Sequence, residues 1–224
     1  MAINDKQAMS KSYKAQVAQY GTPIADEDYK DLRRYAKAHE IRMSGFKDFV
    51  GDISVIKIVI DDICEVASDF PRILDPRRGI VLTLDYGMDD DDFATTDSGH
   101  VIRLNAGYFS DIKKLEAAYN DGVLKRHFVQ GTDWRAISRH EAGHVVDFFY
   151  HVDSVAVAMD ILQVGTKAAV FLTLTKELSI YSAMYPDGRE IISESFSGYY
   201  GRTGNFFAEE FVNRCYLTRN GTDV

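Results

Sequence analysis

The chain has 224 residues, of which 46% are hydrophobic, and its 34 acidic and 26 basic side chains give a formal net charge of −8. A domain of this size and composition can bury a core without disulfides or a structural metal. The acidic balance argues against nucleic acid as the main partner, because that binding requires clustered lysine and arginine. Cys64 and Cys215 lie outside any CxxC or Cys/His cluster, so we expect neither a zinc knuckle nor a disulfide framework.

The first 45 residues are charged and contain two weakly amphipathic stretches, residues 6–20 and 25–40. This pattern predicts a helical N-terminal arm, or a partner-binding segment, over residues 1–45 and one domain over residues 46–224. The N-terminus lacks the apolar stretch of a secretion signal, so we expect a cytoplasmic protein.

The next segment predicts a helix followed by two strands. Apolar residues recur at three- and four-residue steps from Ile56 to Phe70, which is typical of a core helix, and Pro71 ends it. The short β-branched runs 80–84 and 100–105 predict strands. The loop between them holds six aspartates but lacks the alternation and closing glutamate of an EF-hand, so we assign no calcium site.

The rest of the chain reads as helical. Ser110 is expected to cap a helix over 110–119, and Thr132 or Asp133 a further helix ending near Tyr150. The apolar stretch 154–174 has charged and polar residues near its middle, which are costly in lipid, so it predicts two buried helices and no membrane span. A Tyr-Pro-Asp-Gly break at 185–188 predicts the start of another helix. These elements indicate an α+β fold, mostly helical with a small mixed sheet.

The segment richest in chemistry is HEAGH, at residues 140–144. On a helix, His140 and His144 lie one turn apart on the same face, so both imidazoles can reach one metal ion. Zinc prefers nitrogen ligands at this separation. Glu141 lies between them, directed beside the metal, where its carboxylate can accept a proton from a zinc-bound water. The motif therefore predicts the HExxH chemistry of metallopeptidases, with a chance histidine pair as the alternative.

A catalytic zinc usually has three protein ligands and an open fourth position, so a third ligand is needed. The HExxHxxGxxH arrangement would place a histidine at position 150, which is Tyr150. Asp147 has a short side chain on the same helix and is better placed to orient a ligand than to bind the metal. Glu190 and Glu194, one turn apart after the break at 185–188, could present a carboxylate from a second helix, although glutamates are also common on exposed helix faces.

The combined pattern is HEAGHVVD followed, some 46 residues later, by Glu-x-x-Ser-Glu-x-Phe, with a tyrosine upstream of the second motif. Over roughly residues 100–200 it resembles the anthrax lethal factor-like zinc peptidases and small metallopeptidase-like proteins encoded among phage head genes. The resemblance implies a zincin-like fold in which an edge strand borders the active-site helix. It also implies a Zn²⁺ cofactor, with Glu190 as third ligand, Glu194 supporting the site and Tyr181 over the metal.

The chain departs from the family pattern at two places. The loop between Tyr181 and Glu190 is slightly longer, which makes Tyr185 a competing candidate for the tyrosine role, and Ser193 stands where alanine is usual. A second, imperfect copy of the pattern would align Tyr200 and Glu209 instead. That alignment places Asn205, a poor zinc ligand, at the ligand position, so Glu190 is preferred.

The resemblance implies a zinc-dependent endopeptidase acting on a protein or peptide substrate. Glu141 would be the general base, and Tyr181 would donate a hydrogen bond to the developing oxyanion. An extended substrate would pair with the strand 100–105. The alternative is a phage virion-associated or injected effector protein that binds zinc and a protein partner without turnover, which adds a phage particle as a possible location. Glu141 favours the peptidase, since a structural site needs no general base.

Overall fold

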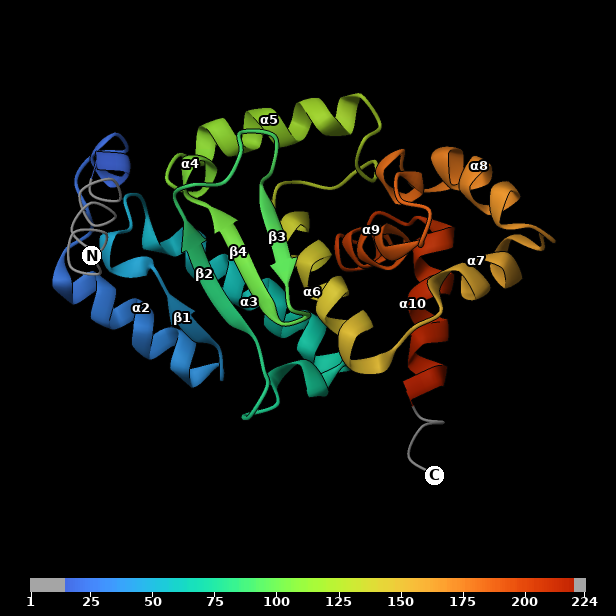
Figure 1. Cartoon of the computed structure of the whole chain (residues 1–224), viewed down its shortest axis with the longest axis horizontal. Coiled ribbons are helices and arrows are strands. Elements are labelled where there is room, and N and C mark those ends of the chain that lie inside the picture. Colours follow the sequence, from blue (N-terminus) through green and yellow to red (C-terminus); the bar gives the residue numbers. More distant parts are fainter. Residues whose placement is uncertain (1–14, 220–224) are drawn as a thin grey trace, which may run out of the picture.

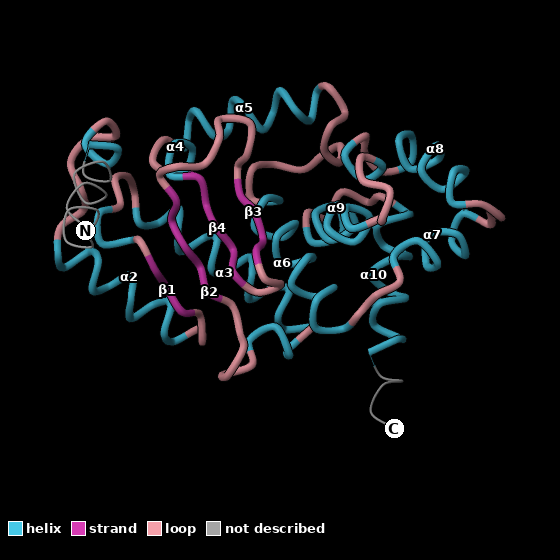
Figure 2. The backbone as a smooth tube through the Cα atoms, in the orientation of Figure 1, coloured by secondary structure: helices cyan, strands magenta, loops and turns pink. Residues whose placement is uncertain are grey.

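The computed structural model describes residues 15–219, and their strands form one four-stranded mixed sheet (Figures 1 and 2). The strand order is β1-β2-β4-β3. β1 (Arg42–Ser44), β2 (Val81–Asp85) and β4 (Val101–Asn105) run parallel, and β3 (Ala94–Asp97) is antiparallel to β4. The prediction of an α+β fold, mostly helical with a small mixed sheet, is confirmed.

Helices surround the sheet, with α2 on the β1 side and α6 to α10 gathered on the β3 side (Figure 1). The described helices are α2 (Asp26–Ala38), η1 (Phe46–Asp48), α3 (Ile53–Asp69), η2 (Pro71–Leu74), α4 (Ala106–Phe109), α5 (Ile112–Leu124), α6 (Ala136–Tyr150), α7 (Ser154–Leu162), α8 (Lys167–Glu177), η3 (Tyr181–Ala183), α9 (Arg189–Tyr200) and α10 (Phe206–Arg219).

The predicted core helix is α3. The side chain of Asp52 caps its first turn by accepting a hydrogen bond from the amide of Ser54 at 2.8 Å, and the helix ends two residues before Pro71. Its periodic apolar face is buried, with Val59 and Ile60 fully inaccessible. This face joins the apolar side chains of β2 and β4 in one core, and α3 also packs against α2 and α6.

The described part of residues 1–45 packs into this same core. Leu32 and Ala36 of α2 and the neighbouring Ile41 are buried in it, and β1 pairs with β2 from Arg42 to Ser44. The boundary at residue 45 stays a prediction; β1, just before it, pairs with β2, which lies beyond it. Most of the predicted helix 6–20 lies outside the described residues.

The sheet edge differs from the prediction. The structure contains both predicted strands, each shifted by one residue or less, but it adds β3 inside the aspartate-rich loop. The pattern of β3 is polar, and its strand conformation depends on pairing with β4, with Ala94 opposite Leu104. Because β4 is hydrogen-bonded to both β2 and β3, the predicted pairing of a substrate along residues 100–105 is wrong. Of the two edge strands, β1 and β3, the one that borders α6 is β3.

Two predicted helix starts are also wrong. Asp111, and not Ser110, caps α5, and its carboxylate accepts hydrogen bonds from the amides of Lys113 and Lys114. α6 begins at Ala136, later than a cap at Thr132 or Asp133 would give. The Thr132 hydroxyl is bonded to Tyr119 and to a backbone carbonyl, and the Asp133 carboxylate accepts a hydrogen bond from the amide of Arg135 in the turn that precedes the helix.

The stretch 154–174 forms α7 and the first part of α8, as predicted, but the helices are buried on one side only. Ala158 and Val170 are fully buried, whereas Leu172 is 68% exposed. Gln163 ends α7 in the left-handed conformation, and Thr166 caps α8. Within residues 15–219 no single helix is long and apolar enough to cross a membrane; α7 and α8, bent by 74° to each other, reach that length and composition only as a pair.

Candidate metal centre

The candidate site lies where α6 and α9 cross, and these two helices have the most extensive contact of any pair of described elements. Gly143 permits the close approach, because a Cβ at this position would lie 2.9 Å from the Cα of Ser193. Gly188, in the left-handed conformation, starts α9 after the predicted break. The first two turns of α9 therefore face the histidine turn of α6.

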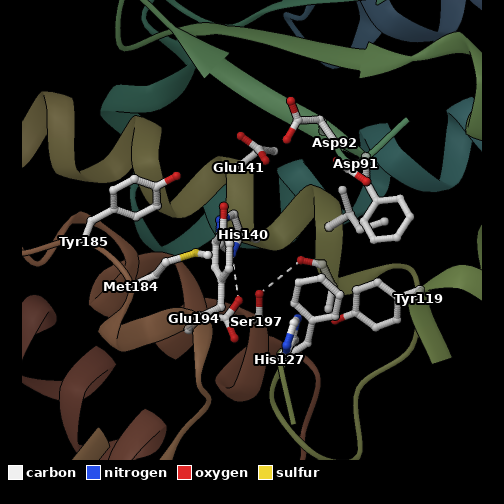
Figure 3. Close-up of a pocket in the computed structure, with 16 residues that line it drawn as sticks. Asp91, Asp92, Tyr119, His127, His140, Glu141, Met184, Tyr185, Glu194 and Ser197 are labelled. Atoms are coloured by element: carbon white, nitrogen blue, oxygen red, sulfur yellow. Dashed lines mark hydrogen bonds and ion pairs between the residues drawn. The ribbon is translucent and has the colours of Figure 1, made fainter. Parts of the chain in front are cut away.

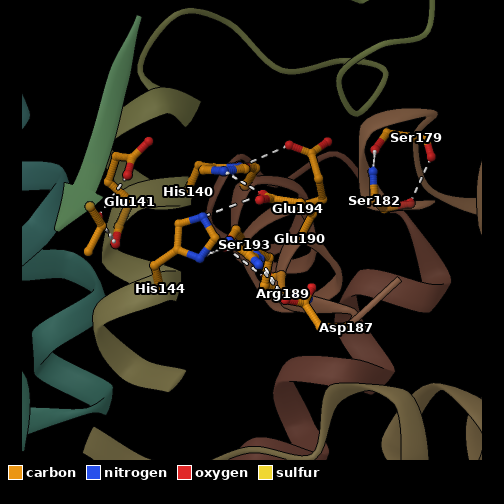
Figure 4. A network of polar contacts seen from close by, with 12 residues as sticks. His140, Glu141, His144, Ser179, Ser182, Asp187, Arg189, Glu190, Ser193 and Glu194 are labelled. Atoms are coloured by element: carbon orange, nitrogen blue, oxygen red, sulfur yellow. Dashed lines mark hydrogen bonds and ion pairs between the residues drawn. The ribbon is translucent and has the colours of Figure 1, made fainter. Parts of the chain in front are cut away.

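Three side chains converge at this crossing: His140, His144 and Glu190 (Figure 4). Oε2 of Glu190 lies 3.1 Å from Nε2 of His140 and 3.4 Å from Nε2 of His144, and the ligand atoms all lie within 4.8 Å of one another. Tetrahedral ligands about 2.0–2.1 Å from zinc stand roughly 3.3–3.4 Å apart, so the spacing fits one zinc ion. Among residues 15–219 this is the group of side chains placed to hold a metal.

The proton positions also favour a cation at this point. Nδ1 of His140 lies 3.0 Å from Oε1 of Glu194, and an ionised carboxylate only accepts, so Nδ1 carries the proton and Nε2 presents its lone pair to Glu190. Oε2 of Glu190 is buried and accepts no hydrogen bond. Two acceptors would then face each other in a buried site, which is costly unless a cation lies between them.

Without a metal, a proton can lie between the facing acceptors in place of the cation. Burial disfavours the charged form of His140, but the carboxylates of Glu190 and Glu194 outweigh it and raise the pKa of His140 well above its ordinary value. Burial alone would raise the pKa of Glu190, yet the adjacent imidazoles of His140 and His144 hold it well below its usual range. The site therefore attracts positive charge in either state.

His144 has its own partner on α9. Oγ of Ser193 lies 2.9 Å from Nδ1 of His144, and Ser193 is fully buried. Each histidine thus has a polar contact on Nδ1, and its Nε2 faces Glu190. The two contact residues, Glu194 for His140 and Ser193 for His144, are adjacent in the sequence of α9.

Glu141 lies on the other side of the histidines, towards β3 (Figure 4). The hydroxyl of Thr96, in β3, donates a hydrogen bond to Oε2 of Glu141 at 2.7 Å and lies 3.3 Å from its backbone carbonyl. The edge strand is thus tied to the helix that carries the histidines.

A cavity of about 480 Å³ opens beside the site (Figure 3). His140 and Glu141 form part of its wall, together with aromatic side chains that include Tyr119, Phe128 and Tyr181. The acidic loop before β3 contributes two exposed carboxylates, Asp91 and Asp92. The cavity could therefore accept part of an organic ligand whose reacting group lies at the metal centre.

Both candidate tyrosines line this cavity. The ring of Tyr181, in η3, lies 5.7 Å from the ring of His140, and the ring of Tyr185 lies 6.4 Å from that of Tyr181. Burial, with nearby Glu190 adding to it, raises the pKa of Tyr181, so its hydroxyl keeps its proton near neutral pH. Tyr185 is 38% exposed and lies under the guanidinium of Arg189, at 5.0 Å.

The other predicted residues are found in different places. Asp147 is half-buried one turn after His144, and burial raises its pKa. It was predicted to orient a ligand, but the side chains hydrogen-bonded to the two histidines come from α9. Tyr200 and Glu209 line a separate hollow, and the Tyr200 hydroxyl donates to Asp69. The alternative alignment therefore places no carboxylate at the histidines.

Thr96 and Ser193 are the residues of this site to which the sequence analysis gave no role. Thr96 was hidden in a polar loop in which no strand was predicted. Ser193 carried one signal, the departure from the usual alanine. No protein-family model, no curated protein and no solved structure matches the chain, so the assignment of this centre rests on its geometry.

Proposed function

We propose that the protein is a zinc-dependent endopeptidase with a zincin-like arrangement of α6 and β3. The observation that carries the proposal is the convergence of two imidazole nitrogens and one carboxylate oxygen at ligand spacing, with Glu141 beside them. Two nitrogens and one oxygen form a donor set typical of catalytic zinc, and three protein ligands leave the fourth position for a substrate or water.

A zinc ion bound here would lower the pKa of a water molecule towards neutrality and polarise the carbonyl of the scissile bond. With such an ion in place, Glu141 is the residue that would accept the proton of the water and donate it to the leaving amine. Its Oε2 is held by Thr96, so Oε1 is the oxygen that takes the proton. Tyr181 keeps its hydroxyl proton and can donate a hydrogen bond to the oxyanion.

For substrate binding we propose the edge strand β3 in place of β4. β3 ends the sheet as described, borders α6, and leads from the acidic loop that contributes Asp91 and Asp92 to the cavity. An extended peptide added to this edge would pass beside Glu141, because Thr96 of β3 contacts Glu141 directly. We also propose the location predicted from the sequence, which is the cytoplasm or a phage particle.

The test is metal content and hydrolysis in matched variants. Wild-type protein is expected to retain about one zinc ion per chain by mass spectrometry, and Glu190→Ala to lose it, whereas Glu209→Ala keeps it as a control on a distant carboxylate. Glu141→Gln is expected to retain zinc and to lose cleavage of a complex peptide mixture, read by mass spectrometry of the products.

The outcomes separate the two candidate functions. Zinc retained together with no cleavage by wild type would favour the alternative of a zinc-binding effector or virion protein without turnover. Equal cleavage by wild type and Glu141→Gln would refute the general-base mechanism, and no zinc in wild type after supplementation would refute the metal centre.

A further inference from the structure

Ser193 occupies a central position in the crossing of α6 and α9. It is fully buried, its Cα is the atom that a Cβ at Gly143 would meet at 2.9 Å, and its hydroxyl has two neighbours. These are Nδ1 of His144 at 2.9 Å and the carbonyl oxygen of Arg189, one turn earlier in α9, at 3.4 Å.

The two neighbours give both hydrogen bonds one consistent direction if a metal occupies Nε2 of His144. The ring proton would then be on Nδ1, which would donate to the hydroxyl of Ser193 at 2.9 Å. The carbonyl of Arg189, 3.4 Å away, can only accept, so it would take the hydroxyl proton of Ser193. A proton on Nδ1 leaves Nε2 of His144 unprotonated, which is the form that binds a metal.

We infer that Ser193 is a positioning residue that holds His144 in its metal-binding tautomer and ring orientation. The inference rests on the proposed zinc centre and assigns to Ser193 the role towards His144 that Glu194 has towards His140. A residue without a polar side chain at this position would leave Nδ1 of His144 buried and without its partner.

The two positioning residues differ in charge. Glu190, Glu194 and Glu141 already place three carboxylates around the site of a doubly charged ion. A neutral hydroxyl at position 193 orients His144 without adding a fourth carboxylate. A metal bound here would therefore keep more of its Lewis acidity than it would with a carboxylate behind each histidine.

The test compares Ser193→Ala with Ser195→Ala. Ser195 is also buried in α9, and its hydroxyl likewise donates to the carbonyl one turn earlier, that of Ile191, but it forms no contact with a histidine. Both variants therefore lose the same kind of helix contact, and only Ser193→Ala loses the partner of His144. Zinc affinity is measured by competition with a chromophoric chelator, on proteins whose folding is verified by circular dichroism.

We expect Ser193→Ala to bind zinc about tenfold more weakly or worse, and Ser195→Ala to stay within about twofold of wild type. In the zinc-loaded wild type, nitrogen-15 spectra of the imidazoles should show a slowly exchanging Nδ1 proton on both His140 and His144. Equal zinc affinity of the two serine variants, or rapid exchange of the His144 Nδ1 proton in wild type, would overturn the inference.

Failure of this inference and failure of the proposed peptidase give different results. Equal affinities beside active wild-type enzyme would remove the role of Ser193 and leave the peptidase intact. Weaker zinc binding by Ser193→Ala beside inactive wild type would support the positioning role and remove the peptidase. Wild type that binds no zinc overturns both.

Discussion

Gly143→Ala is the variant in which the structure links packing directly to the metal centre. The added Cβ would lie 2.9 Å from the Cα of Ser193 and 3.3 Å from the Cβ of Phe196. Ordinary contacts between carbon atoms are about 3.5–4.0 Å, so α9 must move away from α6 by roughly 0.6–1.1 Å. Metal sites tolerate only about 0.2 Å in ligand distance, so this displacement takes Glu190 out of coordination range.

The expected effect of Gly143→Ala on stability is smaller than its effect on zinc binding. Overpacking costs about 1–3 kcal/mol, and the better helix propensity of alanine offsets about 1 kcal/mol, which leaves a net loss of about 0–2 kcal/mol in the metal-free protein. Zinc affinity, by contrast, is expected to fall by more than tenfold, equivalent to about 1.4 kcal/mol or more of binding free energy.

The assays are urea unfolding of the metal-free protein and chelator competition for zinc. Gly165→Ala is the control, because apart from its two neighbours in the chain nothing lies within 4 Å of the Cβ position there. Zinc affinity of Gly143→Ala equal to that of wild type would refute the reasoning, since it would mean that the helix crossing can absorb a methyl group without moving Glu190.

Three further predictions follow from particular contacts. Thr96→Val should lower kcat by about tenfold with zinc content unchanged, because the hydroxyl that donates to Glu141 is lost, and Thr96→Ser should retain most activity. Equal kcat in both variants would show that the hydroxyl does not position Glu141. Asp62→Ala should lower the free energy of unfolding in urea by about 3–5 kcal/mol, because a fully buried carboxylate paired with two arginines is lost. Glu27→Ala on the surface should change the same quantity by less than about 0.5 kcal/mol. Similar losses in the two variants would contradict the role of the buried ion pairs. In the metal-free protein, the raised pKa of His140 adds to the free energy of unfolding. This contribution is complete below the unfolded-state pKa of about 6.5 and is lost as the pH rises through the higher folded-state pKa. Urea unfolding from about pH 6 to about pH 9 should therefore show a decline in the free energy of unfolding that zinc-saturated protein lacks.

Local patterns in the sequence were enough for the elements that depend on neighbouring residues. The three- and four-residue spacing of apolar side chains determined the core helix α3, and the i, i+4 spacing of His140 and His144 placed both imidazoles on one helix face. The break at 185–188 predicted the start of α9. These features rest on periodicity and chain direction, which are properties of consecutive residues.

The resemblance to lethal factor-like peptidases selected Glu190 over Glu209, and the structure brings Glu190 to the histidines while Glu209 lies in a separate hollow. The residues alone did not make that choice, because glutamates at helical spacing are common on exposed surfaces. What distinguishes Glu190 is the close crossing of α6 and α9 at Gly143, and no spacing within one helix contains that information.

Only the tertiary structure decided which residues contact the histidines and Glu141, and where the sheet ends. Ser193 reaches His144 across 49 positions of sequence, and Thr96 reaches Glu141 across 45. β3 has a polar pattern and becomes a strand through its pairing with β4. Such contacts form because separate elements pack against one core. The periodicity of a sequence can predict each helix, but it does not specify which residues of two helices or strands meet across the site.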